Sequence, residues 1–395
     1  MKMYFNGRKR LTKKIFFLKL KMMTCYNNEG STRDRWDVHN VLVTQDAPDT
    51  RNNRTTLGVW SLLLLLGITL LTACNPGNKR ENWTYFHDQG TVFATNYSIK
   101  YAYHRSLQEE IEAAFQTFNL SLNPFMENSI ISKVNRNEPV ELDSLFLTVF
   151  RKSEEVYSLS GGKFDITLSP LINAWGFGFR NLGRVTPEMI DSLKEFVGQE
   201  KISINLQGKI VKSDPRVQLN TSAVAKGYAC DVIAQLLERH GIEHYMVLIG
   251  GEICARGLND RGVCWRIQVD RPIEDTIGFI HEPQVILGLC DKSLATSGNY
   301  RNFYVLDGKR YAHTIDPHTG YPSQNELLSV SIVADDCMTA DAYATAFMAL
   351  GLDESKRLAA RLPGLEYYLI HESEAGNYGV TCSDGFQRLI VDPGE

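Results

Sequence analysis

The sequence predicts an α/β fold, preceded by a segment that targets the chain to a membrane. Residues 84–103 alternate apolar and polar side chains in two runs, as neighbouring strands do. Residues 106–119 repeat apolar side chains at helical spacing. Residues 57–73 form an uncharged apolar stretch that follows two arginines. With 395 residues and 43% hydrophobic composition, the chain can bury one large core or two smaller ones.

Charge is divided unevenly along the chain. Residues 1–56 hold 12 Lys/Arg against 5 Asp/Glu, and residues 57–73 hold neither. Because the whole chain has 42 basic and 46 acidic residues, residues 74–395 hold 30 basic against 41 acidic ones. An acidic body excludes nucleic acid as the expected partner, since phosphate contacts need a basic surface.

The residues before the main domain divide into three segments. Residues 1–56 are polar without periodicity, and we expect them to be disordered or to precede the true translation start. Residues 57–73 predict a lipoprotein signal, because the ending Leu-Thr-Ala before Cys74 resembles a lipobox, in which that cysteine is acylated after cleavage. An uncleaved membrane helix is the alternative. Both place the domain at 83–395 outside the cytoplasm, tethered to a membrane through a linker at 74–82.

The eight cysteines disfavour a metal or redox motif. No pair has C-x-x-C spacing, so a zinc or thioredoxin-like site is a poor interpretation. Six of them lie beyond residue 100, and we expect these to be buried free thiols. One disulfide in an oxidising compartment is the alternative, and the spacing names no pair.

Helical and strand patterns alternate through the rest of the chain. Residues 160–178 have glycines at both ends and a middle that is apolar enough to be core. Residues 294–301 are interpreted as a polar turn. We predict helices at 143–159, 186–198, 223–239, from about 336, and at 353–361. We predict strands at 202–206, 210–212, 245–249, 265–269, 285–289, 303–306 and 366–370, with a terminal hairpin.

The stretch from His313 to Thr345 carries the most distinctive chemistry. Pro317 and Gly320 favour a rigid turn after the histidine. Asp341 and Thr345 are four positions apart in a predicted helix, so a carboxylate and a hydroxyl share one helical face. Two hard oxygen ligands on one face could hold part of a magnesium shell, which a phosphate would complete.

A phosphate site is predicted where the helix at 223–239 begins. Thr221 and Ser222 form a cap region, and a helix N-terminus presents free N–H groups and a partial positive charge. Lys226 adds a full charge, although a solvated lysine on an ordinary helix is the alternative. Gly250-Gly251-Glu252 matches neither G-x-G-x-x-G nor a Walker A loop, which disfavours the standard nucleotide-binding folds.

Taken in order, these motifs resemble the ApbE family of FAD:protein FMN transferases over about residues 83–390. The lipobox agrees with this resemblance, because many family members are lipoproteins. The resemblance implies a single α/β (α+β) domain of T-fold-like elements, with mainly antiparallel sheet and flanking helices. The motifs that carry it are Ser129 with Asn135, residues 162–165, 223–228, 250–252, 296–298 and 313–317, and Ala340-Asp341 with Thr345.

The resemblance also implies an activity and a set of site residues. The FMN moiety of FAD would move to a threonine hydroxyl of a partner protein, with release of AMP and with Mg²⁺ bound. The implied magnesium ligands are Asp341, Thr345 and an oxygen of Ala223. The implied acceptor is a membrane redox pump subunit or another exported flavoprotein, reached from the periplasmic side of the inner membrane. The implied FAD contacts are Phe93, Phe125, Lys163, Phe164, Asp165, Asn220, Lys226 and Ile315.

Three positions depart from the family's usual pattern. Phe93-Ala94-Thr95 stands where Met-Gly-Thr is common. Phe125 stands where tyrosine is common, so a hydroxyl is lost while a stacking ring remains. Asn220 stands where aspartate is usual, which removes a charge at an implied flavin contact.

His313 is our candidate for the general base, with Asp316 or another acid orienting it. A flavin contact and a loop anchor are its alternative roles. Two other functions remain open: a magnesium-dependent FAD pyrophosphatase that gives FMN to water, and a non-catalytic flavin-binding lipoprotein. The last is disfavoured because Asp341, Thr345 and His313 are all retained.

Overall fold

The computed structural model describes residues 84–177, 185–273, 282–299, 303–306, 309–373 and 378–392. The predictions for the N-terminal extension, the signal segment, Cys74 and the linker fall outside the described residues. Within the described ranges, no helix has the length and the apolar character needed to cross a bilayer.

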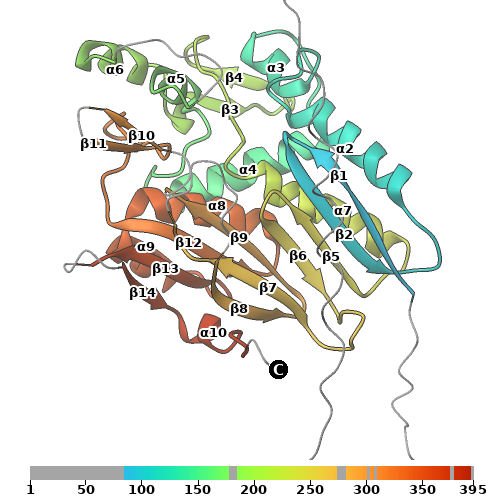
Figure 1. Ribbon diagram of the computed structural model, residues 1–395. Coiled ribbons are helices and arrows are strands. Elements are labelled where there is room, and N and C mark those ends of the chain that lie inside the picture. The colour runs from blue at the N-terminus through green and yellow to red at the C-terminus, as the bar shows by residue number, and fades with distance from the viewer. Residues whose placement is uncertain are drawn as a thin grey trace, which may run out of the picture. The chain divides into compact units, whose positions relative to one another are not determined.

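An eight-stranded sheet forms the centre of the fold (Figure 1). Every neighbouring pair of its strands is antiparallel, which confirms the sheet type that the family resemblance implies. In spatial order the strands are β1 (Tyr85–Val92), β2 (Thr95–Ala102), β5 (Tyr245–Ile249), β6 (Glu252–Arg256), β9 (Lys292–Gly298), β12 (Leu327–Ala334), β13 (Glu366–Glu372) and β14 (Tyr378–Cys382).

Three two-stranded pairs and the helices complete the fold. The pairs are β3 (Ile202–Ile204) with β4 (Ile210–Lys212), β7 (Trp265–Asp270) with β8 (Pro283–Leu289), and β10 (Phe303–Leu306) with β11 (Lys309–Ala312). The helices are α2 (Gln108–Leu122), α3 (Ile130–Asn135), α4 (Ser144–Leu159), α5 (Ser169–Ala174), α6 (Pro187–Lys194), the short 3₁₀ helix η1 (Gln199–Lys201), α7 (Ala225–Arg239), α8 (Cys337–Leu350), α9 (Leu352–Ala359) and α10 (Asp384–Gln387).

Both faces of the central sheet are covered. In β6, Cys254 belongs to the main hydrophobic core, whereas Ile253 and Ala255 belong to a second core that includes Trp265 of β7. Successive strand residues point to opposite faces, so this alternation assigns one core to each face. Helices α7 and α8 cover the first face and α2 and α4 pack outside them, while β7, β8 and α10 cover the second (Figure 1).

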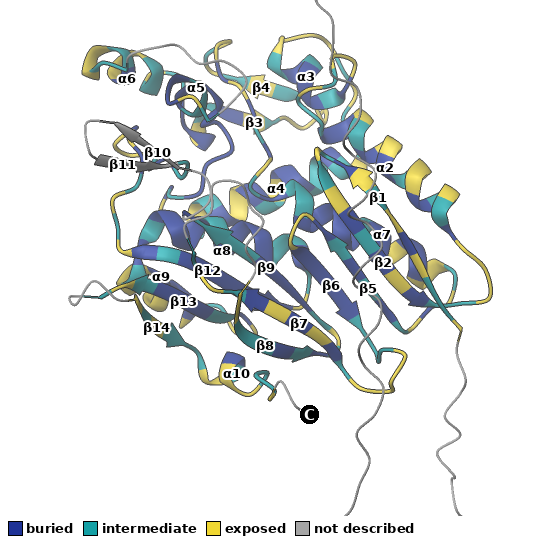
Figure 2. Cartoon of the chain, in the orientation of Figure 1, coloured by how far each residue is buried: buried dark blue, intermediate teal, exposed yellow. Residues whose placement is uncertain are grey.

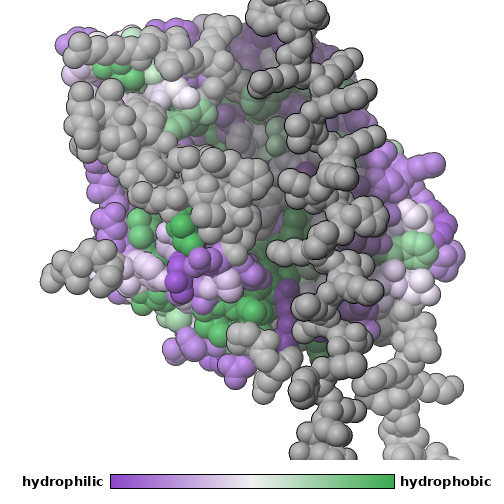
Figure 3. Space-filling model, viewed as in Figure 1, coloured by the Kyte–Doolittle hydropathy of each residue, from purple (hydrophilic) through white to green (hydrophobic). Residues whose placement is uncertain are grey.

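The elements between the layers are the most buried, and those on the outside are partly exposed (Figure 2). Strands β6 and β12 are almost wholly buried, and α8 buries ten of its 14 residues. Helix α2 has a mixed pattern, because its apolar residues face α7 while its acidic residues face outward. Seen from the same side, hydrophilic side chains lie along the right-hand rim, where Figure 1 draws α2 (Figure 3).

Most predicted helices and strands are confirmed with small shifts at their ends, but two interpretations are wrong. The polar turn at 294–301 is wrong for residues 294–298, which lie in β9 between β6 and β12. Its small polar residues are paired inside the sheet, as Thr296 Oγ1 lies 2.8 Å from Ser331 Oγ. The side-chain cap expected at the start of α7 is also wrong, because the backbone carbonyl of Thr221 accepts the N–H groups of Val224 and Ala225 instead.

The expectation of free thiols is wrong for two of the cysteines. Cys264 and Cys290 form a disulfide that joins the start of β7 to the end of β8. The bond closes a loop with a sequence separation of 26, which is worth about 3 kcal/mol in the chain-entropy description. Cys230, Cys254 and Cys337 are buried free thiols, as predicted.

Candidate active site

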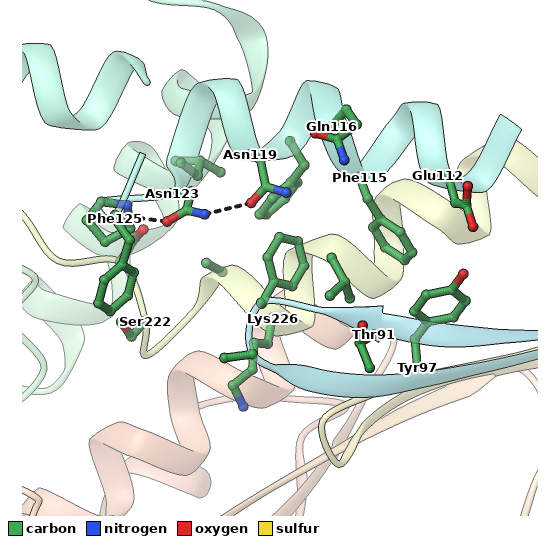
Figure 4. A pocket seen from close by; sticks show the side chains of 18 of the residues that line it. Thr91, Tyr97, Glu112, Phe115, Gln116, Asn119, Asn123, Phe125, Ser222 and Lys226 are labelled. Atoms are coloured by element: carbon green, nitrogen blue, oxygen red, sulfur yellow. Dashed lines mark hydrogen bonds between the residues drawn. The ribbon is translucent and has the colours of Figure 1, made fainter. Parts of the chain in front are cut away.

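A cavity of about 790 Å³ lies between α2, the β1–β2 turn and the start of α7. Its volume is within the range of small-molecule sites, and aromatic and polar side chains line it together. Tyr97 and Phe115 pack against each other in its lining, with ring centroids 5.0 Å apart (Figure 4). Three of the predicted FAD contacts line this cavity, namely Phe93, Phe125 and Lys226.

A tight turn positions Phe93. Val92 pairs with Thr95, so Phe93 and Ala94 are the two central residues of the β1–β2 hairpin, with φ angles of 52° and 57°. This left-handed conformation favours glycine, the residue common at position 94 in the family pattern, so Ala94 adopts it at some conformational cost. The Phe93 ring packs on Phe118 of α2, with centroids 5.2 Å apart.

Phe125 lies on the loop that follows α2. Its side chain is 76% exposed at the edge of the cavity. The loop is held by Asn123, whose side-chain oxygen accepts the Phe125 N–H at 2.9 Å and whose amide donates to Asn119 at 2.8 Å (Figure 4). A fixed backbone therefore presents an exposed ring, as stacking on a planar ligand requires.

Lys226 lies in the first turn of α7 and forms an ion pair with Glu252 at the start of β6. Burial lowers the pKa of Lys226, but the carboxylates of Glu252 and Asp341 outweigh this effect and raise the pKa, so the lysine is protonated. The Oε2 atom of Glu252 is buried and has no hydrogen-bond partner among the described residues. Lys226 therefore satisfies only one of the two oxygens of the Glu252 carboxylate among the described residues.

Asp341 of α8 meets α7 where the two helices cross. Its Oδ2 accepts the N–H of Gly227 at 2.9 Å. A Cβ atom at position 227 would lie 2.3 Å from the carbonyl oxygen of Cys337 and 2.7 Å from the Cβ of Asp341. Glycine is therefore required for the helices to approach this closely. Burial raises the pKa of Asp341, and Lys226 and the Gly227 N–H oppose that effect.

The same contact concerns the implied third ligand. Helix α7 begins at Ala225, so the Gly227 N–H is one of the free amides of its first turn, and Asp341 accepts it. Ala223 precedes the first helical residue by two positions. One turn along α8, the Oγ1 of Thr345 lies 3.4 Å from the Oγ of Ser297 on β9.

These oxygens fit a magnesium ion. Lys226 and Glu252 compensate each other, so the buried carboxylate of Asp341 is left with one charge that no neighbouring cation fully matches. A carboxylate, a hydroxyl and a backbone carbonyl are hard ligands of the kind that magnesium takes, with water and phosphate oxygens filling the remaining positions. Within the described ranges, no cluster of three or more His, Cys, Asp or Glu side chains occurs.

A second group of predicted residues lies on two loops that contact each other. Lys163 donates to Asp316 at 2.7 Å. The Trp175 Nε1–H donates to the carbonyl of Gly320 at 2.8 Å. Asp316 was predicted to orient His313, and the structure shows its carboxylate accepting from Lys163 and from the His318 N–H at 3.0 Å. Lys163 thus anchors the loop that carries the histidine.

The loop around His313 is held by its own backbone. The N–H of Ser323 donates to the carbonyl of Thr314, and Ile315 forms a β-bridge with Pro322. His313 is half-buried, with its ring centroid 6.3 Å from that of Phe177 in an edge-on arrangement. The backbone therefore fixes the position of the histidine, as the Pro-Gly turn predicted.

The remaining predicted contacts face inward or join segments. Phe164 and Ile315 are buried. Asp165 is buried and accepts the N–H of Thr167 at 2.7 Å and that of Gln199 at 3.2 Å, and burial raises its pKa to about 6. The backbone N–H of Asn220 donates to Ile166 at 2.7 Å, so the loop of Lys163 is joined to the segment that leads into α7. FAD contacts from these residues stay predictions.

Reasoning from the sequence gave no role to two residues of the site, Ser297 and Glu252, or to Asp231, which joins its two helices. Ser297 was noted only as part of a motif and lay in the misassigned turn. Glu252 was noted only as part of a motif, although an acidic residue that starts a strand of buried residues signals a paired charge. Asp231, on the same helix as Lys226, gave no signal, because its partners lie more than 100 residues away.

Comparisons with known proteins point to one family. The model of the ApbE family matches residues 93–369. A Vibrio cholerae protein named FAD:protein FMN transferase is 35% identical over 310 residues, covering 75% of this chain and 90% of the relative. An Escherichia coli protein of the same name is 31% identical, covering 72% and 82%.

Solved structures give the same answer. The flavin transferase ApbE from Vibrio cholerae superposes with a TM-score of 0.70 at 32% identity, covering 78% of this chain and 99% of that one. The ApbE protein from Thermotoga maritima superposes with a TM-score of 0.67 at 27% identity, covering 78% and 100%. Sequence, fold and the order of the motifs therefore agree that this chain belongs to the ApbE family.

Proposed function

We propose that this protein is a magnesium-dependent FAD:protein FMN transferase, which moves FMN from FAD to a threonine hydroxyl of a partner protein and releases AMP. The observation that carries the proposal is the contact between α7 and α8, where Asp341 accepts the Gly227 N–H next to Lys226, which itself lines a ligand-sized cavity. The names of the relatives support the same activity.

Lys226 provides a fixed positive charge for the pyrophosphate of FAD. Its ammonium group is protonated and held by Glu252, so it needs no reorganisation when a phosphate arrives. The free N–H groups at the start of α7 add to this charge. Phe93 and Phe125 offer aromatic surface for the planar rings of the substrate.

The chemistry is a displacement at phosphorus. The acceptor oxygen forms a bond to the FMN phosphorus, the bond to the bridging oxygen breaks, and AMP leaves with that oxygen. Mg²⁺ held by Ala223, Asp341 and Thr345 would neutralise the pyrophosphate oxygens and the departing AMP. His313 is our candidate to accept the proton of the threonine hydroxyl, which has a very high pKa on its own.

A direct assay tests the activity. The purified chain is incubated with FAD, Mg²⁺ and a flavinylation domain from a membrane redox pump subunit. We expect covalently bound flavin fluorescence on the acceptor and an equal amount of AMP. An acceptor in which valine replaces the target threonine should stay unlabelled, because it lacks the nucleophile.

The same assay separates the alternatives. Free FMN and AMP without labelled acceptor would establish an FAD pyrophosphatase in place of a transferase. Tight FAD binding without any AMP would establish a non-catalytic flavin-binding lipoprotein. The wild-type chain without Mg²⁺ is the control for the metal requirement, and chelator should stop the release of AMP.

We also propose that the protein acts outside the cytoplasm, anchored by a lipid on Cys74 at the periplasmic side of the inner membrane. The lipobox ending at Cys74 supports this, and the Cys264–Cys290 disulfide is typical of oxidising compartments. Metabolic labelling with a palmitate analogue should mark the wild-type chain but not the Cys74→Ala variant. Equal labelling of both chains would contradict the assignment.

A further inference from the structure

Asp231 joins α7 to the N-terminus of α8. Its Oδ1 accepts the N–H of Cys337 at 2.8 Å, and its Oδ2 accepts the N–H of Met338 at 2.8 Å. The side chain is buried, and it is not among the residues that line the cavity. Burying a carboxylate costs desolvation free energy, which its hydrogen bonds must offset. Because both oxygens accept backbone N–H groups of another helix, the carboxylate can fix the position of that helix.

This contact is one of two among the described residues in which an aspartate of one helix accepts backbone N–H groups of the other. Asp231 of α7 contacts the first residues of α8, and Asp341 of α8 contacts Gly227 in the first turn of α7. On each helix the two contacts are one turn apart, and their order is reversed, so the helices run antiparallel at this point. Together the two contacts fix how far α8 can slide along α7.

We propose that Asp231 is a positioning residue for the magnesium site, acting through the placement of α8. The inference rests on the proposed function. Ala223 precedes α7, whereas Asp341 and Thr345 lie on α8, so the distances among the three ligands depend on the register of the two helices. Mg²⁺ requires near-ideal octahedral geometry at about 2.0–2.1 Å, so small shifts of α8 weaken binding.

Helix α8 has a cap residue of its own in Asp336, whereas Asp231 accepts two further free N–H groups of its first turn from another helix. Asp336 accepts the N–H of Thr339 at 2.8 Å, and the Thr339 hydroxyl donates to its other oxygen at 2.8 Å. Asp336 therefore serves α8 alone, while Asp231 connects two helices. The two aspartates make a matched pair for experiment, since each accepts two hydrogen bonds near the same helix end.

The test compares Asp231→Asn with Asp336→Asn in the intact chain. Asparagine keeps one acceptor oxygen but turns an N–H donor toward the second amide. We expect Asp231→Asn to raise the Mg²⁺ dissociation constant of the flavin-free protein by about tenfold, as outer residues of metal sites do, measured by titration calorimetry. Asp336→Asn should stay within about twofold of wild type, because asparagine caps a helix about as well as aspartate does.

The transfer assay provides a second comparison. At saturating Mg²⁺ the Asp231→Asn chain should recover most of the wild-type rate, because the residue touches neither substrate nor metal. A wild-type dissociation constant in Asp231→Asn, or equal weakening in both variants, would overturn the inference. Absence of Mg²⁺ binding by the wild-type chain would instead remove the metal site itself, and this inference with it.

A measurement on the wild-type chain covers the case in which Asp231→Asn does not fold. If register and metal binding are coupled, Mg²⁺ must stabilise the contacts that set the register. Saturating Mg²⁺ should therefore slow hydrogen exchange at the amides of Cys337 and Met338. Unchanged exchange at both amides, in protein that binds the metal, would overturn the inference.

Discussion

Replacing Asp341 by asparagine should lower the rate of FMN transfer by at least about 10³-fold, because it removes the one charged ligand of the implied magnesium site. The folded chain should tolerate the change. The asparagine oxygen can still accept the Gly227 N–H, and the substitution removes a buried charge whose pKa is raised by burial. We expect the thermal midpoint of the metal-free protein to stay level or rise, while the increase caused by Mg²⁺ disappears.

A matched control separates this effect from a general loss of charge. Asp353 is exposed on α9, so Asp353→Asn should change neither transfer nor the response to Mg²⁺. If Asp341→Asn retained magnesium-dependent release of AMP, the assignment of this residue as a metal ligand would be wrong.

Replacing His313 by glutamine should lower transfer by about 10²–10⁴-fold, the usual contribution of a general base. Glutamine keeps polarity and similar size but cannot take up the proton. The loop should keep its shape, because backbone bonds such as Ser323 N–H to Thr314 O hold it. The measurement is the transfer rate at saturating FAD and Mg²⁺, with FAD affinity and thermal midpoint recorded alongside.

His318 on the same loop provides the control, since it is exposed and histidine is replaced by glutamine in both cases. His318→Gln should transfer FMN at the wild-type rate. A His313→Gln chain that loses FAD affinity but keeps its maximal rate would identify the histidine as a flavin contact. A lowered thermal midpoint with an unchanged rate would identify it as a loop anchor.

Helices and strands were predicted accurately from the sequence where they bury one face and less accurately where they bury both. Strands β1 and β2 and helix α4 each bury one side, so their apolar periodicity predicted them within a few residues. Strand β9 lies inside the sheet with both faces covered, and its Ser-Thr-Ser-Gly composition resembled a turn. A strand that is buried on both faces shows no alternation of apolar and polar side chains, so periodicity cannot identify it.

The disulfide could have been predicted from the positions of the cysteines relative to the predicted strands. Strands were predicted at 265–269 and 285–289, and their antiparallel pairing sets Trp265 opposite Leu289. The cysteines that flank these two residues, Cys264 and Cys290, must then lie side by side. Combining predicted strands with cysteine positions would have named the pair, whereas cysteine spacing alone could not.

The candidate site was predictable where its residues share one element. Asp341 and Thr345 follow from helical spacing within α8. The contacts of Asp341 with Gly227 and of Lys226 with Glu252 join residues on different elements, and no local pattern encodes which elements meet. Family resemblance supplied the link to Ala223, while Asp231 became visible through the tertiary structure alone.

The close contact at Gly227 has a consequence for protein engineering. Grafting this catalytic centre onto a designed helical scaffold by copying its polar residues alone should fail. The space occupied by any larger residue at that position would hold the two backbones apart, and the grafted oxygens would then be too far from each other to share an ion. A graft of this site would therefore need glycine at position 227 as much as it needs Asp341 or Lys226.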